Sequence, residues 1–196
     1  MFETYRTNLR NKQLLKKLPF PETGKLLDVS SGDGSFLEAL HNLHPKLQLF
    51  GIDLSLPEQP SSEINFQVAD ATKLPFEDNH FDIIVCSLSL HHYQNANLVL
   101  YEIHRVLQDN GRVYLTDIMP GNEFTQRIYN FMGCSSPYHF EKYYTEQELI
   151  ALCQNHLLTF DKKFPISPLP RVIAFQFTKK NISLDNDFNS VYTLLN

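Results

Sequence analysis

Acidic residues and glycines lie close together in the segment Leu26–Leu37, which reads LLDVSSGDGSFL. Small residues between an apolar run and a helical pattern predict a tight turn from strand to helix, and ligands of open α/β sheets bind at such turns. Asp53 ends the next apolar run, roughly twenty residues beyond the turn, where a carboxylate can accept both hydroxyls of a ribose. Asp70 follows a further run, near the place to which an adenine would extend.

The charges of this turn argue against a dinucleotide. A dinucleotide fingerprint has Gly or Ala where Leu37 stands, and the bulk of leucine would push the helix off the strand. Asp28 and Asp33 would also add negative charge beside a pyrophosphate. S-adenosylmethionine (SAM) has an adenosine without phosphate, and it carries a positive sulfonium and an ammonium group. The residues therefore favour a SAM site, with a nicotinamide-dependent oxidoreductase as an alternative.

Alternating strand and helix patterns must position these residues. Such alternation predicts βαβ units and a mostly parallel sheet with helices on both faces. The run 81–86 is nearly all apolar, as is typical of a central parallel strand. An amphipathic helix opens the chain and ends at Pro19, Pro21 and Gly24, with its basic residues on a solvated face. We expect strands over 25–29, 47–53, 65–68, 81–86 and 112–118, and helices beginning near Phe36 and covering Asn95–Gln108.

The last third of the chain changes character. Residues 119–144 are irregular and rich in aromatic side chains, which form either a lid over an apolar acceptor pocket or a helical excursion packed on the sheet. His139, Tyr143 and Tyr144 are the polar-tipped members best suited to orient an acceptor. A capping box at 145–148 opens another helix. Two later runs, Thr159–Phe164 and Val172–Thr178, should pair antiparallel, because the PISPLP connection is too short for a crossover helix.

These patterns predict one domain over residues 1–196, a Rossmann-like α/β three-layer sandwich. Its seven-stranded sheet is expected to be mostly parallel with an antiparallel last strand. Residues 1–24 form the N-terminal helix and linker, 119–144 the possible lid, and 181–196 a C-terminal tail. A chain of 196 residues with 42% hydrophobic residues can bury a substantial core.

Composition and charge set limits on function. The formal net charge of −5 argues against a general binder of nucleic acid or acidic membranes. The apolar runs are too short to span a bilayer, and no signal core is evident, so a cytoplasmic location is the default expectation. Three cysteines without ligand spacing make neither a disulfide framework nor a metal site.

Five ordered blocks resemble class I SAM-dependent methyltransferases, most closely the type 11 methyltransferase domain of ubiquinone and menaquinone biosynthesis. The blocks cover most of residues 25–118, in the order and spacing of the family, and continue into the helix before its final strand pair. They read KLLDVSSGDG at 25–34, FGIDL at 50–54, FQVADATKLPF at 66–76, FDIIVCSLSLHHY…EIHRVLQDNGRVYLTDI at 81–118 and YYTEQELIAL at 143–152.

The resemblance implies a set of residues that bind SAM. Around the methionine part these are Asp28, Gly32 and Gly34; at the ribose, Asp53; at the adenine, Leu54, Asp70 and Ala71; and beside the sulfonium, Ser87 and Leu88. Ser30 departs from the family pattern D-x-G-x-G-x-G, in which glycine stands at this position. A serine side chain there would crowd the closest approach of the backbone to the cofactor.

His91 and His92 directly follow the fourth strand, which places them near the transferred methyl group. Either imidazole can act as a general base near neutral pH. Packing or hydrogen bonding is the alternative role, because methyl transfer can proceed by proximity and desolvation when the acceptor is already nucleophilic. Adjacent histidines without nearby acidic or cysteine ligands do not predict a metal site. Glu102 and Arg105 are expected to form a surface pair.

The predicted function is transfer of a methyl group from SAM to the O, N or C atom of a small molecule. The enzyme would act as a monomer or a homodimer. A non-catalytic SAM-fold protein that scaffolds a partner is the alternative, because Ser30 is unusual and no base is obvious from the residues.

Overall fold

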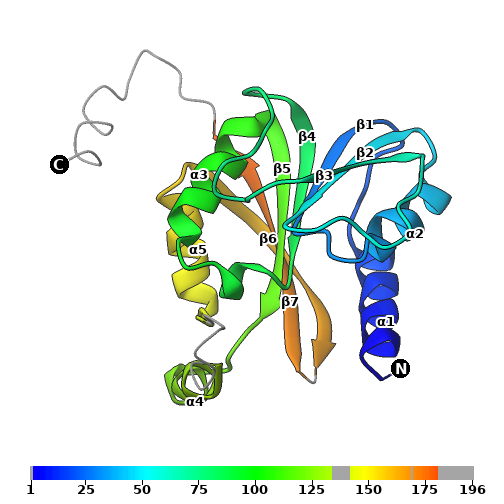
Figure 1. Cartoon of the computed structure of the whole chain (residues 1–196). Helices are drawn as coiled ribbons and strands as arrows, with labels where there is room; N and C mark the ends of the chain where they lie inside the picture. Colours follow the sequence, from blue (N-terminus) through cyan, green and yellow to red (C-terminus); the bar gives the residue numbers. More distant parts are fainter. Residues whose placement is uncertain (1, 134–141, 169, 181–196) are drawn as a thin grey trace, which may run out of the picture.

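A computed structural model describes residues 2–133, 142–168 and 170–180. Within these residues one seven-stranded sheet has the order β3-β2-β1-β4-β5-β7-β6 (Figure 1). Strands β1 to β5 are parallel, and β7 is antiparallel to both of its neighbours, which confirms the predicted sheet. The strands are β1 (Gly24–Val29), β2 (Leu47–Asp53), β3 (Ile64–Val68), β4 (Phe81–Ser87), β5 (Leu107–Ile118), β6 (Leu158–Pro168) and β7 (Arg171–Lys179).

Helices cover both faces of the sheet and complete the three layers (Figure 1). On one face α1 (Phe2–Lys17) and α2 (Ser35–Leu43) pack on a core that includes Leu26. On the other, α3 (Ala96–Val106) and α5 (Glu146–Gln154) pack on a core that includes Leu27. Successive residues of a strand point to opposite faces, and both leucines are fully buried because both faces are covered.

The strand pattern was predicted well, but two boundaries were wrong. The third helix ends at Val106 rather than Gln108, because Leu107 already pairs with Phe81 and begins β5. Strand β6 runs through most of the proline-rich segment that was expected to be a connection. It lies at the edge of the sheet, the position at which strands tolerate proline.

The segment after β5 contains a further helix, α4 (Glu123–Gly133), so its first part is not irregular as expected. In Figure 1 α4 and the first turns of α1 lie at the lower end of the molecule, to which the carboxyl end of β5 points. Residues 134–141, including His139, and the predicted tail over 181–196 lie outside the described residues.

No helix among the described residues is long and apolar enough to cross a membrane. The assignment of residues 1–196 to one domain, the cytoplasmic location and the oligomeric state stay predictions.

Candidate active site

The turn after β1 is built by glycines in the left-handed region of backbone conformation. Gly32 has φ of +57° and Gly34 has φ of +76°, and L side chains rarely adopt such values. A Cβ atom at Gly34 would lie 2.7 Å from Phe66 Cζ, so this glycine lets α2 begin close to β3. A Cβ at Gly32 would meet nothing within 4 Å, so the turn faces open space there.

Leu37 does not push α2 off the sheet. It is fully buried, and it packs against Gly51 of β2, where an added Cβ would lie 2.8 Å from Leu37 Cδ1. A glycine on the neighbouring strand thus makes the room that a small residue at position 37 makes in a dinucleotide fold.

Asp53 joins the end of β2 to the glycine turn. Its Oδ2 accepts a hydrogen bond from the Gly32 amide at 2.8 Å, and its Oδ1 accepts one from the Leu54 amide at 2.7 Å. Leu54, the next residue, is 77% exposed. The three residues that the sequence assigned to methionine, ribose and adenine are therefore neighbours.

Asp28 lies within β1, just below the turn, and is 3% exposed. Its Oδ1 is buried without a hydrogen-bond partner. Burial, with the nearby charge of Asp53 as a second cause, raises the pKa of Asp28 to about 8. Ser87 Oγ and Thr116 Oγ1, at the carboxyl ends of β4 and β5, are also buried without partners. Unpaired buried polar groups are rare in proteins and therefore call for an explanation.

Asp70 shapes the loop after β3. Its Oδ1 accepts hydrogen bonds from the amide and the hydroxyl of Thr72, both at 2.8 Å, and these bonds hold the pKa of Asp70 below its ordinary value. Ala71 beside it is buried.

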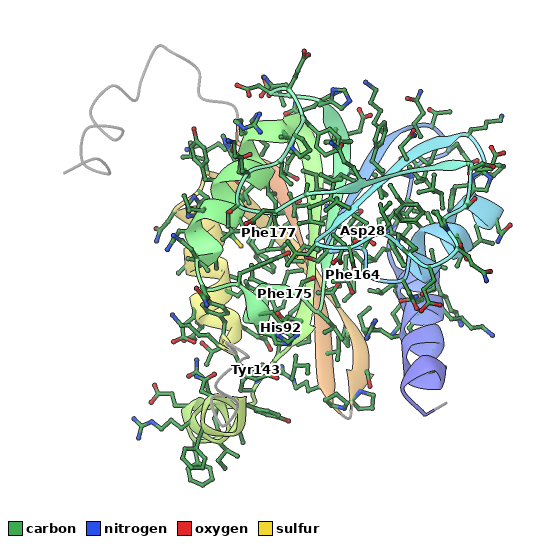
Figure 2. All side chains as sticks on the ribbon, viewed as in Figure 1. Asp28, His92, Tyr143, Phe164, Phe175 and Phe177 are labelled. Atoms are coloured by element: carbon green, nitrogen blue, oxygen red, sulfur yellow. The ribbon has the colours of Figure 1, made fainter. Side chains whose placement is uncertain are left out.

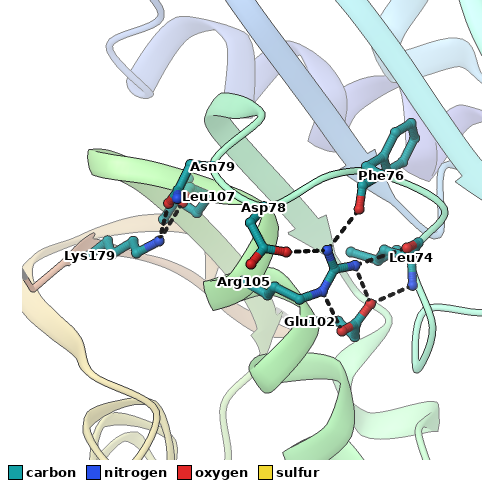
Figure 3. A network of polar contacts seen from close by, with 8 residues as sticks. All are labelled: Leu74, Phe76, Asp78, Asn79, Glu102, Arg105, Leu107 and Lys179. Carbon is teal, nitrogen blue, oxygen red and sulfur yellow. Dashed lines mark hydrogen bonds and ion pairs between the residues drawn. The ribbon is translucent and has the colours of Figure 1, made fainter.

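Glu102 and Arg105 hold the continuation of this loop, which corrects the expectation of a surface pair (Figure 3). Glu102 is 7% exposed, and its Oε2 accepts a hydrogen bond from the Leu74 amide at 2.7 Å. Arg105 donates to Glu102, to Asp78 and to the carbonyls of Leu74 and Phe76, at 2.7–3.0 Å. Both side chains point inward from α3 because the loop backbone supplies partners for every one of their charged groups.

Ser30 adopts a conformation that suits the glycine it replaces. Its φ is +64°, which is uncommon for a residue with a side chain. The Ser30 hydroxyl hydrogen-bonds the Tyr93 hydroxyl at 2.5 Å. Burial raises the pKa of Tyr93, so this hydroxyl stays protonated. Leu88, at the end of β4, has φ of +54°, and such outliers gather at functional sites.

His91 forms a buried pair with Asp117, which sequence reasoning missed. His91 Nδ1 lies 2.6 Å from Asp117 Oδ1, and the His91 amide donates to Asp117 Oδ2 at 3.1 Å. Both residues are at most 5% exposed. Asp117 lies near the carboxyl end of β5, the strand that pairs with β4, and this pairing brings it beside His91.

Tyr143 stacks on His91, with ring centroids 4.8 Å apart and planes 17° from parallel. Helix α4 holds Tyr143 in place: the Gln126 amide group donates to its carbonyl at 3.0 Å, and its own amide donates to Asn130 Oδ1 at 2.7 Å. The ring of Tyr129 packs beside it, with centroids 5.3 Å apart. Residues from the predicted lid thus reach the candidate base.

The other residues that the sequence singled out lie in different surroundings. His92 is exposed, and its ring lies 4.0 Å from that of His91. Tyr144 packs instead in the core under α5, and burial raises its pKa. In Figure 2 His92 and Tyr143 lie toward α4, while Asp28 lies toward α1. Asp82 accepts a hydrogen bond from the Lys25 amide at 2.8 Å, a structural role far from these side chains.

A metal centre has no support among the residues that the structure describes. No three His, Cys, Asp or Glu side chains gather there in a way that would hold an ion.

Comparisons with known proteins identify a methyltransferase domain in this chain. Residues 27–115 match a family model described as a methyltransferase domain. A demethylmenaquinone methyltransferase of Thermotoga maritima is 33% identical over 114 residues, which are 55% of this chain and 50% of the relative. A ubiquinone/menaquinone biosynthesis C-methyltransferase of Desulfotalea psychrophila is 35% identical over 107 residues, covering 51% and 44%. The chain thus spans about half the length of the curated relatives it matches.

Solved structures share the fold. The YcgJ protein of Bacillus subtilis superposes with a TM-score of 0.73 at 18% identity, over 89% of this chain and all of that chain. A Burkholderia thailandensis 1,6-didemethyltoxoflavin-N1-methyltransferase, solved with bound 1,6-didemethyltoxoflavin and S-adenosylhomocysteine, gives a TM-score of 0.64 at 17% identity, over 81% of this chain and 72% of that chain. The predicted resemblance is thereby confirmed: residues 27–115 match the methyltransferase domain, curated methyltransferases are similar over about half of the chain, and the chain shares the fold of solved methyltransferase structures.

Proposed function

We propose that this protein transfers a methyl group from SAM to a small-molecule acceptor at the carboxyl edge of its sheet. The observation that carries the proposal is the acid-lined glycine turn. Asp28 is buried there with an unpartnered carboxylate oxygen, and Asp53 holds the Gly32 amide above it. A ligand with positive charge relieves this arrangement, whereas a pyrophosphate would add to the negative charge.

The residues around the turn fit the parts of SAM. Each carboxylate oxygen has two lone pairs, so Asp53 can accept two ribose hydroxyls while keeping its bonds to the Gly32 and Leu54 amides. Asp70 uses Oδ1 for Thr72, which leaves Oδ2 for the adenine amino group. The open space before Gly32 gives room for the methionine part.

SAM, when bound, supplies an electrophilic methyl group on its sulfonium. Asp117 fixes the tautomer of His91 by accepting the Nδ1 proton, so that Nε2 is the nitrogen that can take a proton from the acceptor atom. Stacking on Tyr143 restricts rotation of the imidazole. Where the acceptor is already nucleophilic, the same residues contribute alignment and exclusion of water.

The names of the relatives support a small organic acceptor. The curated relatives are named for demethylmenaquinone and for ubiquinone or menaquinone biosynthesis, and the Burkholderia enzyme binds 1,6-didemethyltoxoflavin. Tyr129 and Tyr143 add aromatic surface next to His91, which suits an acceptor with an apolar ring. Tyr143 and His92 are the described candidates to orient it, together with the predicted His139.

Calorimetry with SAM, S-adenosylhomocysteine and NAD tests the proposal. We expect saturable binding of both adenosyl ligands and none of NAD. Transfer of isotope-labelled methyl from SAM into a fractionated metabolite mixture then tests turnover and reveals the acceptor. Binding of NAD in place of the adenosyl ligands would overturn the assignment of the site, and binding without transfer to any fraction would favour a scaffold.

A further inference from the structure

The sequence had suggested that Arg10 lies on a solvated helix face. In the structure it lies beside the glycine turn. Asn11, the next residue, donates to Ser35 Oγ at 3.1 Å, which ties this turn of α1 to the first residue of α2. Arg10 is one helical turn before the fully buried Leu14, so it borders the buried face. Lys12 points away and is exposed.

One nitrogen of the half-buried Arg10 guanidinium lacks a hydrogen-bond partner. Its Nε is buried without a hydrogen bond among the described residues. Burial lowers its pKa, and the charges that counteract this are those of Asp28 and Asp33. Arginine stays protonated in proteins, so a positive charge faces the acidic turn.

Arg10 and Asp28 influence each other electrostatically and yet form no ion pair in the described structure. Each keeps a buried polar atom unpartnered, Nε in one and Oδ1 in the other. A buried charge normally has a hydrogen-bonded partner of opposite charge, because isolated charges are costly in the interior. A ligand with an ammonium and a carboxylate group bonded to one carbon atom would give Asp28 and Arg10 a partner each.

We propose that Arg10 and Asp28 bind the two ends of the zwitterionic amino-acid group of SAM, Arg10 its α-carboxylate and Asp28 its α-ammonium. The proposal rests on the proposed function, since it assigns residues to one part of the same ligand. The open space in front of Gly32 lies at this turn, where the amino-acid group would enter. The proposal thus gives the N-terminal helix a direct role in recognising the cofactor.

Three ligands that differ in this group provide the test. S-adenosylhomocysteine carries both charges, its decarboxylated amine S-adenosyl-3-thiopropylamine keeps the ammonium, and 5′-methylthioadenosine has neither. Their dissociation constants are measured by calorimetry. We expect the wild-type protein to bind S-adenosylhomocysteine at least tenfold more tightly than the amine.

The variants should respond according to the group each ligand carries. Arg10→Met should weaken S-adenosylhomocysteine about tenfold or more and leave the amine and methylthioadenosine within about twofold. Asp28→Asn should weaken the first two ligands and spare the third. Lys12→Met, which removes an exposed cation from the same helix, is the matched control and should change none of them.

Binding of methylthioadenosine reports that each variant is folded. Equal losses of all three ligands in Arg10→Met, or no loss at all, would overturn the inference and leave the proposed function standing. A wild-type protein that binds none of the adenosyl ligands would overturn the proposed function, and the inference with it.

Discussion

Arg105 and Arg10 both lie near carboxylates, and their surroundings differ sharply. Arg105 donates to Glu102, to Asp78 and to two backbone carbonyls (Figure 3). Arg10 has a buried Nε without a partner, and it lies near Asp28, whose Oδ1 also lacks one. The pKa of Arg105 is raised by its hydrogen bonds to Glu102, while burial lowers that of Arg10.

The difference distinguishes charges that hold the fold together from charges that lack partners within the chain. The Arg105 network is complete within the chain, so its function is to hold the loop between β3 and β4. The group around Arg10 is incomplete, as are Ser87 and Thr116 at neighbouring strand ends. Unsatisfied groups gathered at this edge of the sheet support the proposal that a ligand binds there.

The largest expected effect contrasts how much the two arginines contribute to the free energy of unfolding. Arg105→Met leaves the buried Glu102 carboxylate without its cation and should lower the free energy of unfolding by about 3 kcal/mol. Arg10→Met removes a cation without a close partner and should change it by less than about 1 kcal/mol. Urea denaturation measures both. Equal losses would mean that Arg10 also holds the fold together.

The pair of His91 and Asp117 is an exception to the comparison, because it lies at the ligand edge and yet is satisfied internally. If His91 is the base, His91→Asn should lower kcat about 100-fold and leave the affinity for S-adenosylhomocysteine within about twofold. Asp117→Asn should act in the same direction and alter the pH profile of kcat, since Asp117 positions the imidazole. An unchanged kcat in both variants would assign the pair to packing alone.

Substitution of Asp53 tests whether the carboxylates at the strand ends bind the ligand. Asp53→Ala removes a carboxylate that would accept the ribose hydroxyls, so the affinity for S-adenosylhomocysteine should fall about tenfold or more. Calorimetry measures the change, and Glu63→Ala, at an exposed position before β3, is the control. Unaltered affinity would place the ribose elsewhere.

Asp28 should make the stability of the fold depend on pH. In the unfolded chain this carboxyl loses its proton near its ordinary pKa of 3.8, whereas in the fold it keeps the proton up to a pKa of about 8. The folded state therefore binds more protons between these values, and the free energy of unfolding should fall as pH rises through this window, by at most about 1.4 kcal/mol per pH unit.

Asp28→Asn should flatten that slope, which denaturation at several pH values can measure. The ammonium group of the ligand favours ionised Asp28, and Arg10 acts in the same direction. Binding of S-adenosylhomocysteine near pH 7 should therefore release a proton from the wild-type protein, and calorimetry in buffers of different ionisation enthalpy detects it. Absence of proton release would argue that Asp28 is already ionised without ligand.

The smallest effects concern Ser30. Ser30→Gly relieves a positive φ, worth about 1 kcal/mol, but loses the hydrogen bond to Tyr93, worth about as much. We expect a net change within about 0.5 kcal/mol for this variant, and a loss of about 1 kcal/mol for Tyr93→Phe, which breaks the bond without relieving the backbone. Thermal unfolding compares the two. A large loss in Ser30→Gly would show that serine is needed for more than this bond.

The sequence predicts the sheet well because hydrophobic patterning depends on neighbours along the chain. The mostly parallel sheet, its antiparallel final strand and the acids at the strand ends all followed from local patterns and from the family resemblance. The positions of Arg10 and Asp117 did not, because each acts on a residue distant in sequence. Arg10 looked like one more basic residue on an amphipathic helix, and only the packing of α1 on α2 distinguishes it from Lys12.

Strand ends and helix ends were the other source of error. The helix before β5 was extended to Gln108 because Leu107 fits an apolar helical stripe, but pairing with Phe81 outweighs that local preference. The prolines of β6 read as a loop because a single sequence does not reveal which strand is at the edge of a sheet.

Those prolines also affect how the protein behaves at high concentration. Strand β6 forms one border of the sheet, and an open border can template a strand from another molecule. Pro165 and Pro168 carry no amide hydrogen, and a bulge between Pro165 and Ser167 interrupts the ladder. The exposed Lys162 and Lys163 add like charges to any identical strand that approaches. This border is therefore protected against the edge-to-edge association that leads to aggregation.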